Sequence, residues 1–164
     1  NLIKTEKFMK YVVIIIIIAL AIVYFNRSAN NKKLAAENIA KGEAFLEGNK
    51  AIEGIIETSS GLQYQVINKE DGTTQPTASS KVKVHYHGTL IDGTVFDSSV
   101  DRGEPLSFGL NQVIKGWTEG VQLMSVGDKY KFFIPSNLGY GNRSAGKITP
   151  GSVLIFEVEL LEIQ

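Results

Sequence analysis

The chain has 164 residues, no cysteine and no net charge, with 17 basic and 17 acidic side chains. Without cysteine it can form no disulfide, thiolate metal site or cysteine nucleophile. Residues 1–50 carry a net charge of +4 and residues 51–164 a net charge of −4. Because nucleic-acid binding requires clustered positive charge, we expect no nucleic-acid partner for the acidic part. The length allows one ordinary domain and an appendage.

The first predicted element is an apolar helix near the N-terminus. Residues 8–25 form an eighteen-residue run in which Lys10 is the only charged side chain. At ~1.5 Å per residue the run is roughly 27 Å long, enough to cross a thin bilayer. Lys10 and Arg27 stand where basic side chains can reach lipid headgroups. We therefore predict a membrane anchor or signal segment within residues 1–27.

Three interpretations of this segment are open. A buried core helix or strand would also be apolar, but nothing downstream requires so apolar a partner. A cleaved signal peptide would use Ala19 and Ala21 as its cleavage signal, yet the apolar run continues through residues 22–25. An uncleaved anchor explains the whole run and is favoured. Basic residues flank both ends, so charge does not decide the orientation.

Residues 28–51 are predicted to form a helical stalk or linker. Gly42, Gly48 and Asn49 are expected to interrupt or end the helix. A solvated stalk is the simplest interpretation, whereas a dimerisation helix would need a longer repeat of apolar positions, so a dimer has no support from the pattern. The weak apolar stripe consists of Leu34, Ile39, Phe45 and Leu46.

The rest of the chain alternates polar and apolar residues in the manner of β-strands. In the second strand, Val82, Val84 and Tyr86 are expected to face the core, and the intervening lysines and histidines the solvent. Asp92-Gly93 predicts a hairpin turn after this strand. The expected strands are residues 61–68, 81–87, 129–134 and 153–163.

One helix is predicted within this sheet. Apolar residues recur at a spacing of four from Val113 through Trp117. In the first strand, Leu62, Tyr64 and Val66 are expected to share the core face. Strands around a single short helix indicate an α+β fold, with an antiparallel sheet wrapped around that helix.

Motifs within residues 52–164 resemble those of the FKBP family of peptidyl-prolyl isomerases. In chain order they are V-H-Y-H-G-T-L-I-D-G-T-V-F-D-S-S from Val84, V-I-K-G-W from Val113, I-P-S-N-L-G-Y-G from Ile134 and L-I-F-E-V-E-L-L from Leu154. The preceding G-E-A-F-L-E-G-N-K-A-I-E-G-I-I-E-T-S-S-G-L-Q-Y resembles the macrophage-infectivity-potentiator-like bacterial branch. The resemblance implies an FKBP-like isomerase domain over residues 52–164 that uses no cofactor and no metal.

The resemblance also implies the roles of individual residues. Trp117 would form the floor of an apolar cup for the proline ring, and Tyr86 would stand beside it. Tyr140 would donate its hydroxyl to a substrate carbonyl. Asp97 would lie at the rim, steadied by Arg102. The other substrate-binding residues would be Phe96, Leu106, Phe108, Val113, Ile114, Ile148 and Phe156.

Rotation about a prolyl peptide bond suits such a cup. The barrier of ~18–20 kcal/mol arises because the bond loses its resonance on twisting. Water solvates the dipole of the planar form, so an apolar cup favours the twisted form relative to the planar one. The backbone N–H of Ile114 would be a second donor to the substrate, again by resemblance. The reaction requires no base, metal or nucleophile.

Two other clusters have simpler interpretations. His85 and His87 share a strand face and could chelate a metal, but they have no third ligand nearby and are expected to face solvent. Asp97, Asp101 and Glu104 could form a carboxylate site, but the turn composition around them favours a solvated loop.

We predict a membrane-anchored peptidyl-prolyl cis-trans isomerase that accelerates the folding of exported proteins with slow Xaa-Pro bonds. Its partners would be proline-containing polypeptides, and the resemblance adds macrolide inhibitors of the tacrolimus or rapamycin type. The expected location is the bacterial inner membrane, single-pass, with the isomerase domain in the periplasm; a cleaved, soluble periplasmic form is the alternative. A non-catalytic, membrane-tethered chaperone module stays open because of Leu106 and Lys147, which depart from the family pattern. An anchored structural subunit is a third class.

Overall fold

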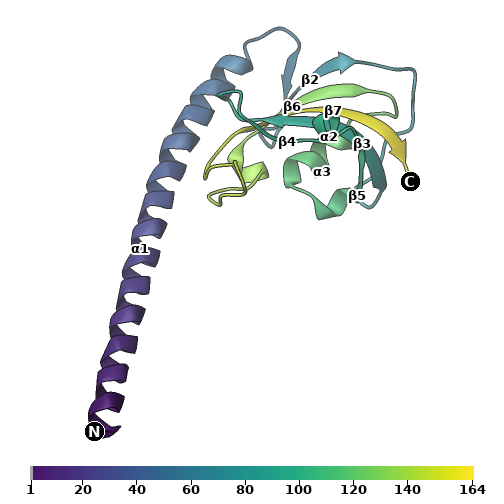
Figure 1. Cartoon of the computed structure of the whole chain (residues 1–164). Helices are drawn as coiled ribbons and strands as arrows, with labels where there is room; N and C mark the ends of the chain where they lie inside the picture. Colours follow the sequence, from purple (N-terminus) through teal and green to yellow (C-terminus); the bar gives the residue numbers. More distant parts are fainter. Residues whose placement is uncertain (1) are drawn as a thin grey trace.

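The computed structural model describes residues 2–164 and shows a long N-terminal helix leading into one antiparallel sheet (Figure 1). The sheet wraps around the short helix α3, so the α+β fold predicted from the sequence is confirmed. The helices are α1 (Leu2–Asn49), α2 (Ser99–Arg102) and α3 (Lys115–Val121), with 3₁₀ turns η1 (Leu110–Gln112) and η2 (Ser136–Leu138). The strands are β1 (Ile55–Glu57), β2 (Gln63–Asn68), β3 (Lys81–Thr89), β4 (Val95–Ser98), β5 (Leu106–Gly109), β6 (Lys129–Ile134) and β7 (Leu154–Ile163).

The part of the sheet that forms the candidate site is centred on strand β3. The strand order is β1-β2-β6-β7-β3-β4, and β5 also pairs with β3. Tyr86 on β3 lies opposite Val158 on β7. The predicted turn at Asp92-Gly93 joins β3 to β4, and Gly93 has φ +88°, a conformation that glycine adopts without strain. The hairpin therefore carries β4 back alongside His87 and Gly88, next to Tyr86 in the chain.

Helix α3 lies close to the sheet because two of its glycines face β6. A Cβ on Gly116 would lie 2.6 Å from the side chain of Ile134, and a Cβ on Gly120 would lie 2.6 Å from the ring of Phe132. Ile134 and Phe132 are both fully buried. The spacing of four places the two glycines on one helix face. Their close approach holds Trp117, on the adjacent face, at a defined depth in the fold.

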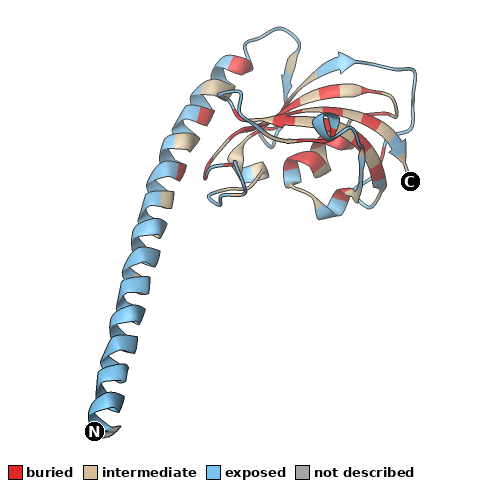
Figure 2. Cartoon of the chain, in the orientation of Figure 1, coloured by how far each residue is buried: buried red, intermediate tan, exposed pale blue. Residues whose placement is uncertain are grey.

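Helix α1 is continuous, and the predicted interruption at Gly42 is wrong. A Cβ at this position would lie 2.7 Å from the side chain of Val153, so Gly42 serves close packing rather than a break. The expectation of a solvated stalk is also wrong for residues 35–49, which pack on the sheet part (Figure 2). The buried or half-buried positions are Ala35, Asn38, Ile39, Gly42, Phe45, Leu46 and Asn49.

Polar side chains complete this docking. The buried amide of Asn49 donates a hydrogen bond to Gln63 Oε1 at 2.8 Å. The Gln63 amide in turn donates to the backbone carbonyl of Leu46 at 2.9 Å. Further up the helix, Asn38 donates to the carbonyl of Pro150 at 2.8 Å. Because buried polar groups are costly unless they are paired, these bonds define how α1 sits on the sheet.

The predicted core face of the first strand is only partly right. Leu62 is fully buried and Tyr64 is half-buried, stacked on Tyr130 at 5.6 Å between ring centroids. Val66, however, is 40% exposed, whereas Gln63 on the other face is fully buried. The reason is that α1 covers the start of β2 from the side that was expected to face solvent.

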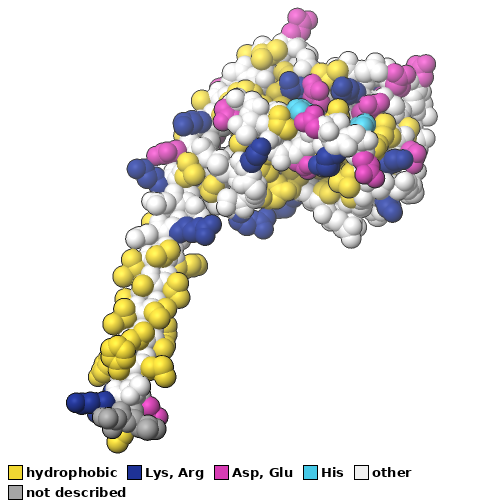
Figure 3. Space-filling view, in the orientation of Figure 1, with side chains coloured by type: hydrophobic (Ala, Val, Ile, Leu, Met, Phe, Trp, Pro, Cys, Tyr) yellow, Lys and Arg dark blue, Asp and Glu magenta, His cyan; other side chains and the backbone are white. Residues whose placement is uncertain are grey.

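The N-terminal part of α1 projects away from the sheet with its apolar side chains exposed (Figure 3). Within residues 8–25 every side chain is exposed except Ala21, which is half-buried. The helix is long and apolar enough to cross a membrane: an eighteen-residue window has a mean hydropathy of 2.7 and is 0% buried within the protein. A signal sequence has the same length and composition.

Candidate active site

A cavity of about 810 Å³ opens beside α3, between β3, β5, β7 and the loop that follows η2. Its volume lies within the range of small-molecule and peptide-side-chain sites. The structure brings together nine of the twelve predicted site residues at its wall. These are Tyr86, Asp97, Leu106, Phe108, Val113, Ile114, Trp117, Tyr140 and Phe156.

The floor of the cavity is the indole of Trp117, which is 5% exposed. Tyr86 and Phe156 meet this ring edge-on, with centroid distances of 5.2 and 5.1 Å, and Phe108 lies 5.3 Å away at a tilt. Edge-to-face contacts between aromatic rings are favourable beyond their buried area. The four rings therefore support one another and leave an apolar depression between them.

Two predicted substrate-binding residues, Phe96 and Ile148, lie behind the wall and do not line the cavity. Phe96 packs edge-on against Phe156 at 5.2 Å and so supports a wall residue. Ile148 is buried in the core, in a short backbone bridge with Ala145. Gly88 leaves room for this packing, because a Cβ there would lie 2.7 Å from both Phe96 and Phe156.

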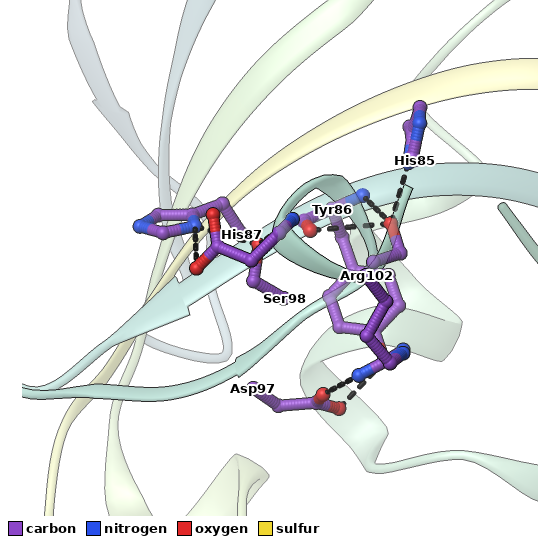
Figure 4. Close-up of polar contacts among 8 residues, drawn as sticks. His85, Tyr86, His87, Asp97, Ser98 and Arg102 are labelled. Atoms are coloured by element: carbon purple, nitrogen blue, oxygen red, sulfur yellow. Dashed lines mark hydrogen bonds and ion pairs between the residues drawn. The ribbon is translucent and has the colours of Figure 1, made fainter. Parts of the chain in front are cut away.

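Asp97 reaches the rim of the cavity within a hydrogen-bonded group of three side chains (Figure 4). The Tyr86 hydroxyl donates to Asp97 Oδ2 at 2.6 Å, and Arg102 forms an ion pair with Asp97 Oδ1. Arg102 also donates to the Tyr86 hydroxyl at 3.0 Å. The predicted contact between Arg102 and Asp97 is present, and Arg102 itself lies outside the cavity lining.

The electrostatics of this group show which protonation states are present. Burial raises the pKa of Asp97, but the hydrogen bonds from Tyr86 and Arg102 outweigh it and hold that pKa below its ordinary value. Burial, and next the hydrogen bond to Asp97, raise the pKa of Tyr86. At neutral pH Asp97 is therefore an anion and Tyr86 a neutral donor. Neither is suited to proton transfer near pH 7.

His85 and His87 lie on the outward face of β3, as expected, and are partly covered there by α2. The ring of His85 hydrogen-bonds Ser99 at 2.6 Å, and the ring of His87 hydrogen-bonds Ser98 at 2.8 Å (Figure 4). Both serines lie at the start of α2, so these bonds hold α2 on β3 and place Arg102 near the cavity. Among the described residues no group of three histidine or acidic side chains could hold a metal ion.

Tyr140 lies on the cavity wall in the loop that follows η2. Backbone bonds close this loop: the N–H of Gly141 donates to Ser136 O at 2.8 Å, and the N–H of Gly151 donates to Gly141 O at 2.8 Å. Within residues 2–164 the Tyr140 hydroxyl has no hydrogen-bond partner. It is available to a ligand.

Sequence reasoning missed the polar residues of the wall. Gln112, Lys115, Asn137, Asn142 and Arg143 all line the cavity. The signal available from the sequence was that these residues stand next to residues of the recognised motifs. Single polar residues in loops carry no periodicity, however, so nothing in the chain pattern indicated that their side chains converge.

The fold and this cavity define the class of protein. Residues 72–161 match the family model described as FKBP-type peptidyl-prolyl cis-trans isomerase, and residues 17–66 match the domain amino terminal to FKBP-type peptidyl-prolyl isomerase. The chain belongs to the FKBP-type peptidyl-prolyl cis-trans isomerase family. The resemblance stated from the motifs is therefore confirmed.

Individual relatives cover most of the chain. It is 60% identical, over 83% of its length, to the FKBP-type peptidyl-prolyl cis-trans isomerase FkpA of Aeromonas hydrophila. It is 49% identical, over 84% of its length, to the outer membrane protein MIP of Legionella longbeachae. The crystal structure of FkpA from Escherichia coli matches 84% of the chain with a TM-score of 0.80 and 46% identity.

The chain is shorter than these relatives. It spans 50% of the Aeromonas protein and 59% of the Legionella protein, and 64% of the Escherichia coli FkpA chain in the crystal. The isomerase model nevertheless covers β3 to β6, α3 and β7 as far as residue 161, and the amino-terminal model covers β1 and β2 as far as residue 66.

Proposed function

We propose that this protein is a peptidyl-prolyl cis-trans isomerase that binds proline-containing polypeptides in the cavity above Trp117. The observation that supports it most directly is an apolar depression of four aromatic rings, with the Tyr140 hydroxyl free at its wall. Family membership supports the same activity. A macrolide of the tacrolimus or rapamycin type is a further ligand class, since the cavity of about 810 Å³ lies in the small-molecule range.

The mechanism follows from differential solvation and hydrogen bonding. A proline ring on the Trp117 indole removes the imide from water, which weakens the solvation of the planar form more than that of the twisted form. The Tyr140 hydroxyl and the backbone N–H of Ile114 would hold the substrate carbonyls on either side. Asp97, Tyr86 and Arg102 would keep the rim rigid through their mutual bonds. No covalent intermediate forms.

The activity is tested on the whole chain in detergent with an Xaa-Pro peptide in a protease-coupled assay. The wild-type chain is expected to accelerate isomerisation, and Tyr140→Phe to lower kcat/KM about two- to tenfold, the loss of one hydrogen bond. Tyr64→Phe is the matched control, because Tyr64 stacks on Tyr130 outside the cavity. Absence of any acceleration by the wild-type chain would remove the proposal.

We also propose three functional regions: an anchor in residues 1–27, a connecting helix in residues 28–51 and the isomerase domain in residues 52–164. The apolar surface of residues 8–25, exposed throughout except at Ala21, supports an anchor. The proposed setting is a bacterial inner membrane with the domain in the periplasm. The pattern gives no support to a dimer through residues 35–49, and one face of that helical segment packs on the protein's own sheet part.

The anchor is tested by fractionation of cells that express the protein, followed by mass spectrometry of its N-terminus. We expect the protein in the membrane fraction with residues 8–25 intact. A soluble periplasmic protein that begins just after Ala21 would show a cleaved signal instead and would contradict the anchor. Replacement of residues 8–25 by a known cleavable signal is the control, expected to yield a soluble and active domain.

A further inference from the structure

The lining of the cavity contains more positively charged than negatively charged side chains. Two cations, Lys115 and Arg143, line it against one carboxylate, that of Asp97. The charge of Asp97 is paired with Arg102, which also donates to the Tyr86 hydroxyl. Because this pairing compensates the only carboxylate among the described lining residues, the cavity presents net positive charge to a bound chain.

Neither cation of the wall has an acidic partner. Lys115 and Arg143 are exposed, and within residues 2–164 neither takes part in an ion pair. Arg143 Nε makes a long contact of 3.5 Å to the Tyr140 carbonyl. Glu119, one turn beyond Lys115 on α3, instead accepts a hydrogen bond from Thr58 at 2.7 Å. Both positive charges therefore remain available to a ligand.

The two cations stand beside the groups that would hold a substrate backbone. Lys115 directly follows Ile114, whose backbone N–H is the proposed donor on α3's side of the cavity. Arg143 lies three residues after Tyr140, the proposed donor on the loop side. A peptide held by both donors passes both cations, whose long side chains can reach the residues next to the proline.

We propose that the site selects proline-containing segments that carry an acidic residue within two positions of the proline. This inference rests on the proposed isomerase function and names its substrate class. The same charges disfavour basic segments. An exposed ion pair changes affinity about two- to fivefold, and the preference weakens as salt screens the charges.

The test uses the whole chain in detergent and peptides that share one Leu-Pro centre but carry Glu, Gln or Lys two positions before the proline, or two positions after it. Exchange NMR spectroscopy measures kcat/KM without a protease whose own specificity would interfere. We expect the order Glu, Gln, Lys in at least one series, with steps of about two- to fivefold at low salt. The steps should shrink at 0.5 M salt, because the screening length falls from about 10 Å at 0.1 M salt to about 4 Å.

Lys115→Gln and Arg143→Gln identify the residues responsible. Each is expected to bring the Glu-to-Gln ratio of kcat/KM toward one. Lys41→Gln is the matched control, because it removes the same charge from an exposed position of α1 outside the cavity lining, and its ratio should equal that of the wild type.

The outcomes separate the two proposals. Equal acceleration of the Glu, Gln and Lys peptides would overturn the charge preference and leave the isomerase function standing. No acceleration of any peptide would overturn both. A Glu preference that persists unchanged in Lys115→Gln and Arg143→Gln would overturn the assignment of the preference to these side chains.

Discussion

Gly120→Ala is expected to lower the free energy of unfolding by about 1–3 kcal/mol, although alanine is the better helix former. The added Cβ would lie 2.6, 2.9 and 3.1 Å from three atoms of the Phe132 ring. Phe132 is fully buried on β6 and packs beside Tyr130, so its ring has no room to move away. Helix α3 must shift instead, and Trp117 must shift with it. We therefore also expect a lower kcat/KM.

Gly48→Ala is the matched control, because Gly48 also lies in a helix but has no atom within 4 Å of the added Cβ. There the better helix propensity of alanine should raise the free energy of unfolding by about 0.5–1 kcal/mol. Urea unfolding followed by circular dichroism measures both variants. Equal effects of the two substitutions would contradict the idea that α3 depends on this close contact.

Replacement of Trp117 is expected to have the largest effect on activity. Trp117→Ala removes the ring that contacts Tyr86, Phe108 and Phe156, and should destabilise the fold by about 3–5 kcal/mol. The lost contact with the proline ring, about 1.5–3 kcal/mol of apolar burial, corresponds to a fall in kcat/KM of roughly ten- to a hundredfold.

Trp117→Phe distinguishes the contribution of the aromatic ring surface from that of the indole N–H. In the described part of the chain Trp117 Nε1 is the one buried side-chain nitrogen or oxygen without a hydrogen-bond partner. Such a group costs about 1–3 kcal/mol, so its removal offsets part of the lost volume. We expect Trp117→Phe to be clearly more stable and more active than Trp117→Ala.

Both variants are compared at a temperature at which circular dichroism shows them folded, so that unfolding does not imitate a catalytic defect. The Xaa-Pro assay then measures kcat/KM for each. An alanine variant that is folded and as active as the wild type would show that Trp117 is not the floor on which proline rests. A phenylalanine variant as impaired as alanine would show that apolar ring surface is not what this position supplies.

Local signals in the chain predicted the four longest strands, but the short strands β1, β4 and β5 were not among those expected. The alternation in residues 81–87 depends only on successive side chains pointing to opposite faces, and the Asp92-Gly93 turn only on two adjacent residues. The structure has β3 at Lys81–Thr89 and the turn directly after it. Strand β6 has the predicted bounds, Lys129–Ile134.

The docking of α1 was not predictable in the same way. Its contact face mixes the apolar Ile39, Phe45 and Leu46 with small or polar residues at 35, 42 and 49, so the apolar stripe that indicates burial is weak. From the sequence alone Gly42 is interpreted as a helix breaker, and only the close contact with Val153 shows that it serves packing. The burial of Gln63 is likewise explained only by its hydrogen bonds to Asn49 and Leu46 of α1, which the sequence pattern does not show.

The order of the residues alone was enough to establish the family, the strand periods, the apolar segment and most of the cavity wall, because motifs and periodicities are properties of neighbours along the chain. Contacts between residues that are distant in the sequence were revealed only by the tertiary structure. They are the close contacts of the α3 glycines with β6, the positions of Phe96 and Ile148 behind the cavity wall, and the presence of Lys115 and Arg143 in the lining of one cavity. Such contacts join residues far apart in sequence, and close packing decides which of them can coexist.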